Sequence, residues 1–370
     1  MIFNPDGKFF NSGGCFPFVK SRFTENEKLV LYGLVRYPNA KDRELAEKLG
    51  LKHSTVISIR RRLREHDYFR TIRLPMLQDF GCEIMAVAYT NFNPVIPLQK
   101  RIEITENRIE VSEEMFFSLG EFEKGFSLSL SRDYTSIGKI NDVRTETFGK
   151  LGLLEKEYPT EVIFPFDISK VYRFFCYTPL IEKYFDIEGG NGECRLEKSR
   201  EISLSENEKI VFYGLVKYPE HSDKKIGELL NVSRHTVSRM RKKFEEGGYL
   251  RQVRIPNLGK MGFDILAFYH IRYDPSNPPV FERDEVRSLL NDSIIFMATR
   301  KFEAVLIGVY PGYDEYKADK VRIMQLLKAK KWIARDPVIR TYGLSKSIII
   351  KNFDFSPITK KTFELKLSEY

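Results

Sequence analysis

The chain has 370 residues, of which 42% are hydrophobic, and a formal net charge of +9 at pH 7. This length supports several buried cores, and no apolar run approaches the roughly 18–20 residues that span a bilayer. The four cysteines lack C-x-x-C spacing and there are only five histidines, which argues against a disulfide framework or a zinc site. The N-terminus also lacks the basic start and apolar stretch of a signal peptide. We therefore expect a cytoplasmic protein with no membrane segment, no metal and no cofactor.

The sequence contains a long internal duplication. Residues 24–94 align without a gap onto residues 205–275 at an offset of 181, and 27 of the 71 aligned positions are identical. A period near 180 is too long for a solenoid unit, so we interpret it as two copies of a whole set of domains. Four domains, two per repeat, fit typical domain sizes.

Each repeat begins with a pattern of three helices. Capping boxes predict the start of the first helix in both copies, at Thr24 with Glu27 and at Ser205 with Glu208. A short second helix is expected over 42–50 and 223–231, with Asp42 and Asp223 as N-caps and with Gly50 and Asn231 as left-handed C-terminal residues. The third helix is expected over 53–66 and 234–247. This spacing is typical of a helix-turn-helix, and the alternating segments 70–75 and 251–256 would supply a wing.

The excess positive charge lies in these third helices and the strands that follow them. Residues 52–73 carry seven Lys or Arg against two acidic residues, and residues 233–254 do the same, so each window is +5. Together they give +10, and the remaining residues sum to −1. A surplus confined to equivalent segments of a repeat indicates contact with a polyanion.

Helical periodicity separates the faces of the third helix. Val56, Ile59 and Leu63 recur with core spacing, so the hydroxyl and basic residues opposite them are predicted to face DNA, the former suited to base edges and the latter to phosphates. Arg60 and Arg241 fall nearer the core edge, and we interpret them as structural or phosphate-contacting. The predicted DNA-binding residues are His53, Ser54, Thr55, Ser58, Arg61, Arg62, Arg70, Arg73, Arg234, His235, Thr236, Arg239, Lys242, Lys243, Arg251 and Arg254.

A second domain follows each helix-turn-helix. Alternating segments at 83–92 and 264–273 predict half-buried strands. Repeat two continues with a predicted helix (282–292), two strands, a second helix and a strand near 337–349, which is the βαββαβ order of a ferredoxin-like domain. Repeat one has the same pattern, with its first helix near 97–109. The segments ending in TPLIEKYFDI and SPITKKTFEL predict an apolar helix that closes each repeat.

The stretch 222–271 resembles the Lrp/AsnC (feast/famine) transcription regulators, and repeat one resembles them more loosely. The tandem layout also resembles a euryarchaeal regulator of archaellum genes, so the resemblance implies an archaeal source. The family implies an α+β fold, here a tandem duplication of a winged helix-turn-helix and a ferredoxin-like domain. The expected limits are a tail (1–21), winged helix-turn-helix 1 (22–80), ferredoxin-like domain 1 (81–187), a linker (188–202), winged helix-turn-helix 2 (203–261) and ferredoxin-like domain 2 (262–370).

The resemblance also implies a candidate effector motif. Family members that bind amino acids carry a hairpin similar to T-G-x-[YF]-D, whose glycine lets the backbone approach the effector. Repeat one keeps Gly120 and Phe122 and has Glu123 in place of the aspartate. Repeat two has Arg300 in place of the glycine, which we expect to fill the effector's space.

We therefore predict a sequence-specific regulator of transcription that binds double-stranded promoter DNA through two winged helices. The basal transcription machinery is a candidate partner. Since family members dimerise through their sheets, one chain is expected to act as an internal pseudo-dimer or to form a higher oligomer. No phosphate-loop, dinucleotide or hydrolase motif occurs, so we predict that the chain is not an enzyme. A small-molecule-responsive regulator and an RNA-binding protein remain as alternatives.

Overall fold

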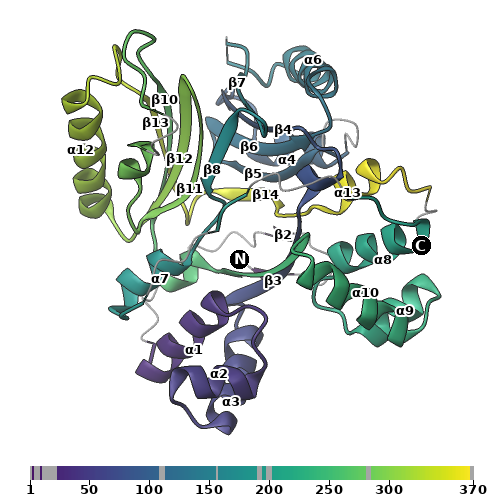
Figure 1. Ribbon diagram of the computed structural model, residues 1–370. Helices are drawn as coiled ribbons and strands as arrows, with labels where there is room; N and C mark the ends of the chain where they lie inside the picture. The colour runs from purple at the N-terminus through teal and green to yellow at the C-terminus, as the bar shows by residue number, and fades with distance from the viewer. Residues whose placement is uncertain are drawn as a thin grey trace.

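The computed structural model describes residues 2–3, 9–10, 23–107, 113–155, 157–189, 194–196, 202–280 and 285–366. Most of the predicted tail and linker lie outside these residues. Each repeat forms a head of three helices followed by a sheet with a long helix on its outer face (Figure 1), so the predicted duplicated α+β fold is confirmed. Among the described residues, no helix is both long and apolar enough to cross a membrane.

The two heads have the predicted helices. In repeat one they are α1 (Glu25–Arg36), α2 (Asp42–Leu49) and α3 (His53–Glu65), and in repeat two α8 (Glu206–Lys217), α9 (Asp223–Leu230) and α10 (Arg234–Glu246). Both capping boxes form, and Gly50 and Asn231 adopt the left-handed conformation, with φ of 65° and 53°. The first helix of each head therefore starts, and the second helix stops, where local sequence signals predict.

The predicted N-caps of the second helices are wrong by one residue. Lys41 and Ser222 occupy the N-cap positions. Asp42 instead accepts a hydrogen bond from Arg60 at 2.5 Å, and Asp223 pairs with Arg241 at 2.9 Å. Each ion pair ties the second helix of a head to the third, so Arg60 and Arg241 are structural.

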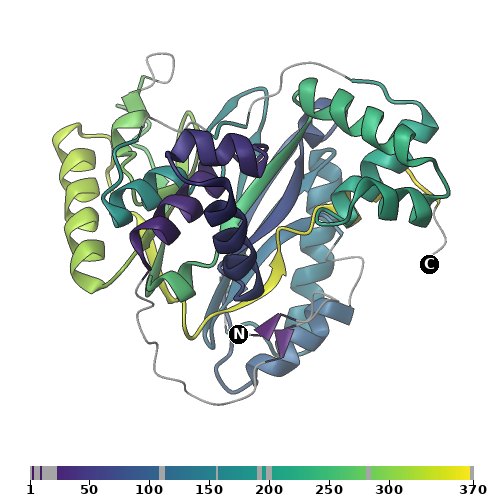
Figure 2. The same ribbon diagram turned by 90° about the horizontal axis from the view of Figure 1, so that it is seen from below.

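The strand after each head does not form a wing with its own head. β3 (Phe69–Pro75) pairs with β9 (Leu250–Pro256) of the other repeat in a two-stranded antiparallel sheet, the β3–β9 ladder. Ile72 lies opposite Val253, and these two residues are equivalent at the offset of 181. The ladder is therefore centred on the pseudo-two-fold axis that relates the repeats, and it joins the two heads directly (Figure 2).

Two buried arginines reinforce this ladder reciprocally. Arg73 donates a hydrogen bond to the carbonyl of Leu215 at 3.3 Å, and Arg254 donates one to the carbonyl of Leu34 at 3.1 Å. Each carbonyl belongs to the last turn of a head's first helix, where backbone oxygens lack an intrahelical donor. Burial lowers the pKa of both Arg73 and Arg254 to about 10. Each repeat thus caps a helix of the other.

The second domains have the predicted ferredoxin-like order. In repeat one the elements are β4 (Ile84–Asn91), α4 (Leu98–Asn107), β5 (Met115–Gly120), β6 (Lys124–Ser131), α6 (Tyr134–Lys150) and β7 (Thr160–Pro165). In repeat two they are β10 (Ile265–Arg272), η3 (Glu285–Leu289), β11 (Ile294–Arg300), β12 (Glu303–Tyr310), α12 (Tyr313–Ala329) and β13 (Val338–Gly343). The first helix of repeat two differs from the prediction: residues 281–284 lie outside the described residues, and 285–289 form a 3-10 helix.

Short elements connect these parts. The turns η1 (Leu77–Phe80) and α11 (Leu258–Met261) lie between each ladder strand and its sheet, and each ends at a glycine with positive φ, Gly81 and Gly262. Two short strands, β1 (Ile2–Phe3) and β2 (Phe9–Phe10), pair with each other near the N-terminus.

The strand predicted near 337–349 is two strands, and the second one crosses to the other repeat. β13 completes the sheet of repeat two, whereas β14 (Ile348–Asn352) pairs with β5 of repeat one. Reciprocally, β8 (Ser169–Arg173) of repeat one pairs with β11 of repeat two. Each sheet therefore has five strands, in the orders β14-β5-β6-β4-β7 and β13-β10-β12-β11-β8. The closing helices α7 (Thr178–Phe185) and α13 (Ser356–Thr362) then pack against α1 and α8, the first helices of their own heads.

The inner faces of the two sheets pack against each other. Phe126 of one sheet lies 5.2 Å from Phe268 of the other, measured between ring centroids. At the pseudo-two-fold axis, Tyr89 Oη lies 3.0 Å from Nδ1 of its equivalent, His270. The long helices α6 and α12 cover the outer faces (Figure 1). One chain therefore builds a closed pair of domains, as the internal pseudo-dimer requires.

Exchange of β8 and β14 predicts that the two repeats stay together without a covalent link. We expect a chain cleaved at a protease site inserted between Ser199 and Arg200 to elute from a sizing column at the volume of the uncut chain. Separation should occur only in denaturant, because it exposes an apolar interface and breaks three strand pairings, β8 with β11, β14 with β5 and β3 with β9. The uncut chain with the same insertion is the control, and fragments that elute separately in native buffer would contradict the exchange.

Candidate nucleic-acid interface

The third helices present the predicted faces. In α3 the core residues Val56, Ile59 and Leu63 are buried, as are Val237 and Phe244 in α10, while Met240 is half-buried. The predicted DNA-facing residues of the two helices lie opposite. The exposed ones are His53, Ser54, Ser58, Arg61, Arg62, Arg234, His235, Arg239, Lys242 and Lys243, and Thr55 and Thr236 are half-buried. Both helices therefore offer polar and basic side chains to a partner.

One basic side chain of each third helix pairs with the glutamate of a capping box. Arg62 lies 2.7 Å from Glu27, and at the equivalent positions Lys243 lies 2.5 Å from Glu208. The hydrogen bond from Lys243, together with the Ser205 backbone N–H, lowers the pKa of Glu208. The basic members of both pairs are about half exposed, so solvent screens these contacts and a phosphate could replace the carboxylate.

The heads differ at the positions that point outward. Ser58 in α3 stands where Arg239 stands in α10, and Ser54 where His235 stands. Among the described residues, no carboxylate lies within 4 Å of Arg239. Arg239 is therefore a long exposed cation, whereas its equivalent is a short hydroxyl.

Three of the arginines predicted to contact DNA instead form hydrogen bonds within the protein. Arg73 and Arg254 are 6% and 2% exposed and bond to helix carbonyls, so their assignment to DNA is wrong. The guanidinium of Arg70 donates to the backbone and side-chain oxygens of Asn352 and lies over the Phe353 ring. Burial lowers the pKa of Arg70 to about 10, and its assignment fails for the same reason. Arg251 is exposed and donates to the carbonyl of Arg195 at 3.0 Å.

A signal in the sequence separates these two classes of cation. Three pairs of arginines are identical in the two repeats: Arg60/Arg241, Arg70/Arg251 and Arg73/Arg254. In all of these except Arg251, the guanidinium forms one of the ion pairs or interior hydrogen bonds described above. The exposed cations of α3 and α10 are instead replaced in the other repeat by Lys, Arg, Ser or His, and in the case of Arg64 by Glu245. Identity between repeats therefore marks structural arginines.

The candidate effector motif lies in the tight turn between β5 and β6. Phe122 is 51% exposed and Glu123 is exposed, so both point away from the sheet. Gly120, in contrast, ends β5 at the edge of a cavity. In repeat two, Arg300 does not project into a free space but pairs with Glu303 of its own hairpin at 2.6 Å. The three motif residues of repeat one are therefore not brought together on one surface.

No protein-family model and no curated protein sequence matches this chain. Solved structures do match it. The crystal structure of the siroheme decarboxylase NirDL aligns over 92% of this chain and 99% of its own, with a TM-score of 0.50 and 14% identity. Over this 92%, the chain is similar in fold to a siroheme decarboxylase. At 14% identity this likeness concerns only the duplicated architecture. It does not assign the roles of that enzyme's residues to residues of this chain.

This match corrects one prediction. We predicted that the chain is not an enzyme because it lacks familiar catalytic motifs, and that prediction is overturned by an enzyme built on the same full-length fold. Shorter matches cover about one repeat. AsnC of E. coli is 12% identical over 39% of this chain and 93% of its own (TM-score 0.30), and an AsnC-family regulator of Pyrococcus furiosus is 15% identical over 39% and 89% (TM-score 0.30). Both repeats consist of a helix-turn-helix head joined to a βαββαβ domain, the arrangement that the resemblance to Lrp/AsnC regulators predicted.

Proposed function

We propose that this protein is a transcription regulator that binds double-stranded DNA with α3 and α10. The main support for this proposal is that the two repeats have equivalent basic helices, each with an exposed polar face. The β3–β9 ladder connects the heads to which these helices belong. A basic helix in a helix-turn-helix suits the major groove. Two such helices in fixed relation suit two half-sites of one duplex better than an irregular RNA fold, so RNA binding is the less favoured alternative.

The ladder arginines do not contribute to this footprint. Without Arg70, Arg73 and Arg254, the cations available to phosphates are those on the polar faces of α3 and α10, with Arg251 beside them. We expect five to eight phosphate contacts in all, with hydroxyls and Arg239 nearest the base edges. The narrower resemblance to archaellum regulators stays a prediction, as do the domain limits.

Decarboxylation of a tetrapyrrole is a second candidate function, favoured by the full-length architecture alone. Anaerobic incubation of the protein with siroheme, followed by mass measurement of the extracted tetrapyrrole, tests it. Loss of carbon dioxide would support this candidate. An unchanged mass, together with specific binding of a duplex, would exclude decarboxylation and support DNA binding.

The proposed function predicts a steep dependence of affinity on salt. With five to eight phosphates neutralised, log K should fall with log salt at a slope of roughly −4 to −7. Fluorescence anisotropy on a labelled duplex measures this slope. Lys242→Ala should make it shallower by about one, whereas Lys224→Ala, on the exposed side of α9, should leave it unchanged. A slope shallower than about −2 would rule out two engaged heads.

The capping-box ion pairs predict a gain of affinity on removal of an acidic charge. Glutamine at position 27 or 208 can still bond to the N-cap backbone N–H but no longer competes with phosphate for Arg62 or Lys243. We expect Glu27→Gln and Glu208→Gln each to tighten binding about two- to fivefold at low salt, with the gain fading as salt rises.

Glu206→Gln is the matched control for this measurement, since Glu206 begins the same helix but pairs with Lys209 rather than with α10. Equal gains in the control and the test variants would show that overall charge, and not these two contacts, sets the affinity.

A further inference from the structure

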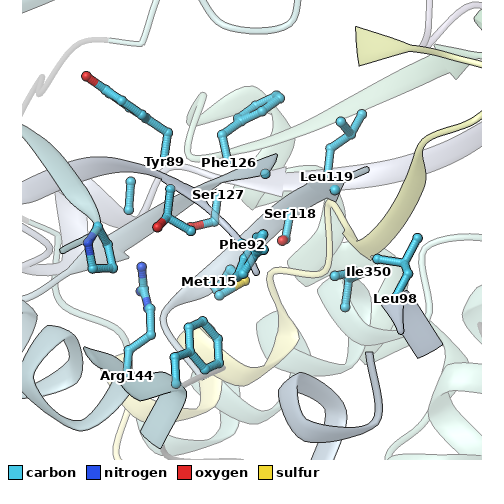
Figure 3. Close-up of a pocket in the computed structure, with 16 residues that line it drawn as sticks. Tyr89, Phe92, Leu98, Met115, Ser118, Leu119, Phe126, Ser127, Arg144 and Ile350 are labelled. Atoms are coloured by element: carbon cyan, nitrogen blue, oxygen red, sulfur yellow. The ribbon is translucent and has the colours of Figure 1, made fainter. Parts of the chain in front are cut away.

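A cavity lies under the outer helices of repeat one (Figure 3). It lies between the outer face of the sheet and α6 and is partly open to solvent. Its walls are mostly apolar, with Phe92, Met115, Phe148 and Ile350 among them. Its polar side chains are those of Thr90, Ser118, Ser127 and Arg144, with Tyr89 also in the lining, so the cavity combines an apolar body with a few polar groups.

The equivalent space in repeat two is filled. Ala88 faces Ser127 across β4 and β6, and at the same register Tyr269 faces Leu306 across β10 and β12. Tyr269 and Leu306 are fully buried in the core of repeat two. Small residues in repeat one thus open the space that large residues close in repeat two.

Arg144 is the feature that apolar packing does not explain. It is the eleventh residue of the 17-residue helix α6, and the eleventh residue of the 17-residue helix α12 is Ile323, which is fully buried. Arg144 is itself only 6% exposed, and its Nε has no hydrogen-bond partner. Figure 3 shows its side chain directed from the helix toward the sheet. A buried cation stands where the twin repeat has an apolar side chain.

Burial without a direct partner is unfavourable for a charged group. Among the described residues, no carboxylate lies within 4 Å of Arg144. Burial lowers the pKa of Arg144, and the negative charge of Glu161 opposes this shift. Burial in turn raises the pKa of Glu161 to about 7, so this carboxyl is a weak counter-ion near neutrality. A ligand carboxylate would satisfy Arg144 far better.

We propose that this cavity binds a compact organic carboxylate whose apolar body lies against the sheet and whose carboxylate bonds to Arg144. A planar guanidinium donates two parallel hydrogen bonds to a carboxylate, and Ser118 and Ser127 supply hydroxyl donors beside it. Among the residues that the structure describes, no acidic side chain lines the cavity, so an α-ammonium group would enter without a partner. The site therefore selects a carboxylic acid that lacks this group, and not an amino acid.

Isothermal titration of the full chain with phenylacetate tests the proposal, with 4-methylpentanoate as a second carboxylate of different shape. Phenylacetamide removes the charge and L-phenylalanine adds the ammonium group. We expect both to bind at least tenfold more weakly than phenylacetate, because one loses the charge-assisted bonds and the other buries an unpaired cation.

Three variants complete the experiment. Arg144→Ile installs the residue of repeat two and should weaken phenylacetate binding about tenfold to a hundredfold without lowering the melting temperature. Ala88→Tyr keeps the arginine but fills the cavity, and should abolish binding. Ser129→Gly, which installs the repeat-two residue on β6 outside the cavity, should bind normally. Failure of both carboxylates to bind the wild-type chain, or unchanged affinity in Arg144→Ile or Ala88→Tyr, would overturn the proposal.

Discussion

The arrangement of this molecule depends on the β3–β9 ladder. In this ladder, the strand that follows one head pairs with the strand that follows the other. Arg73 and Arg254 stabilise the pairing, because each caps a helix of the opposite repeat. Because these arginines are buried and donate to otherwise unsatisfied carbonyls, breaking either contact leaves polar groups without partners. The heads are therefore held in one relation, and the outward faces of α3 and α10 gain a fixed separation.

Duplication within one chain removes the requirement that the two halves be identical. A dimer of identical chains must change both of its sites together. Here Arg239 occupies the position in repeat two that Ser58 occupies in repeat one, and Ile323 the position that Arg144 occupies. The first difference lies on the surface that we propose reads DNA. The second places a cation in the lining of the cavity of repeat one.

The sequence predicts the parts of this molecule that depend on local signals. Capping boxes, helical periodicity and alternating strands locate the helices of the heads and the central strands of the sheets to within one or two residues. The exchange of β8 and β14 between the repeats could not be predicted, because it depends on which edges of the two sheets lie next to each other in the folded chain. Arg73 and Arg254 were misassigned since charge alone does not distinguish a buried capping group from a phosphate contact. The cavity could not be predicted from the sequence, because it depends on the strand register that places Ala88 beside Ser127.

Footprinting of a single chain on a duplex selected from random sequence tests the central claim most directly. A pair of heads fixed by the ladder predicts two protected half-sites about one helical turn apart or a multiple of it, roughly 10–10.5 base pairs per turn. The half-sites should differ in sequence, and Arg239→Ala should relax the preference in only one of them. Insertion of five base pairs between them should abolish high-affinity binding. A perfect palindrome bound by one chain, or affinity indifferent to the insertion, would contradict the account.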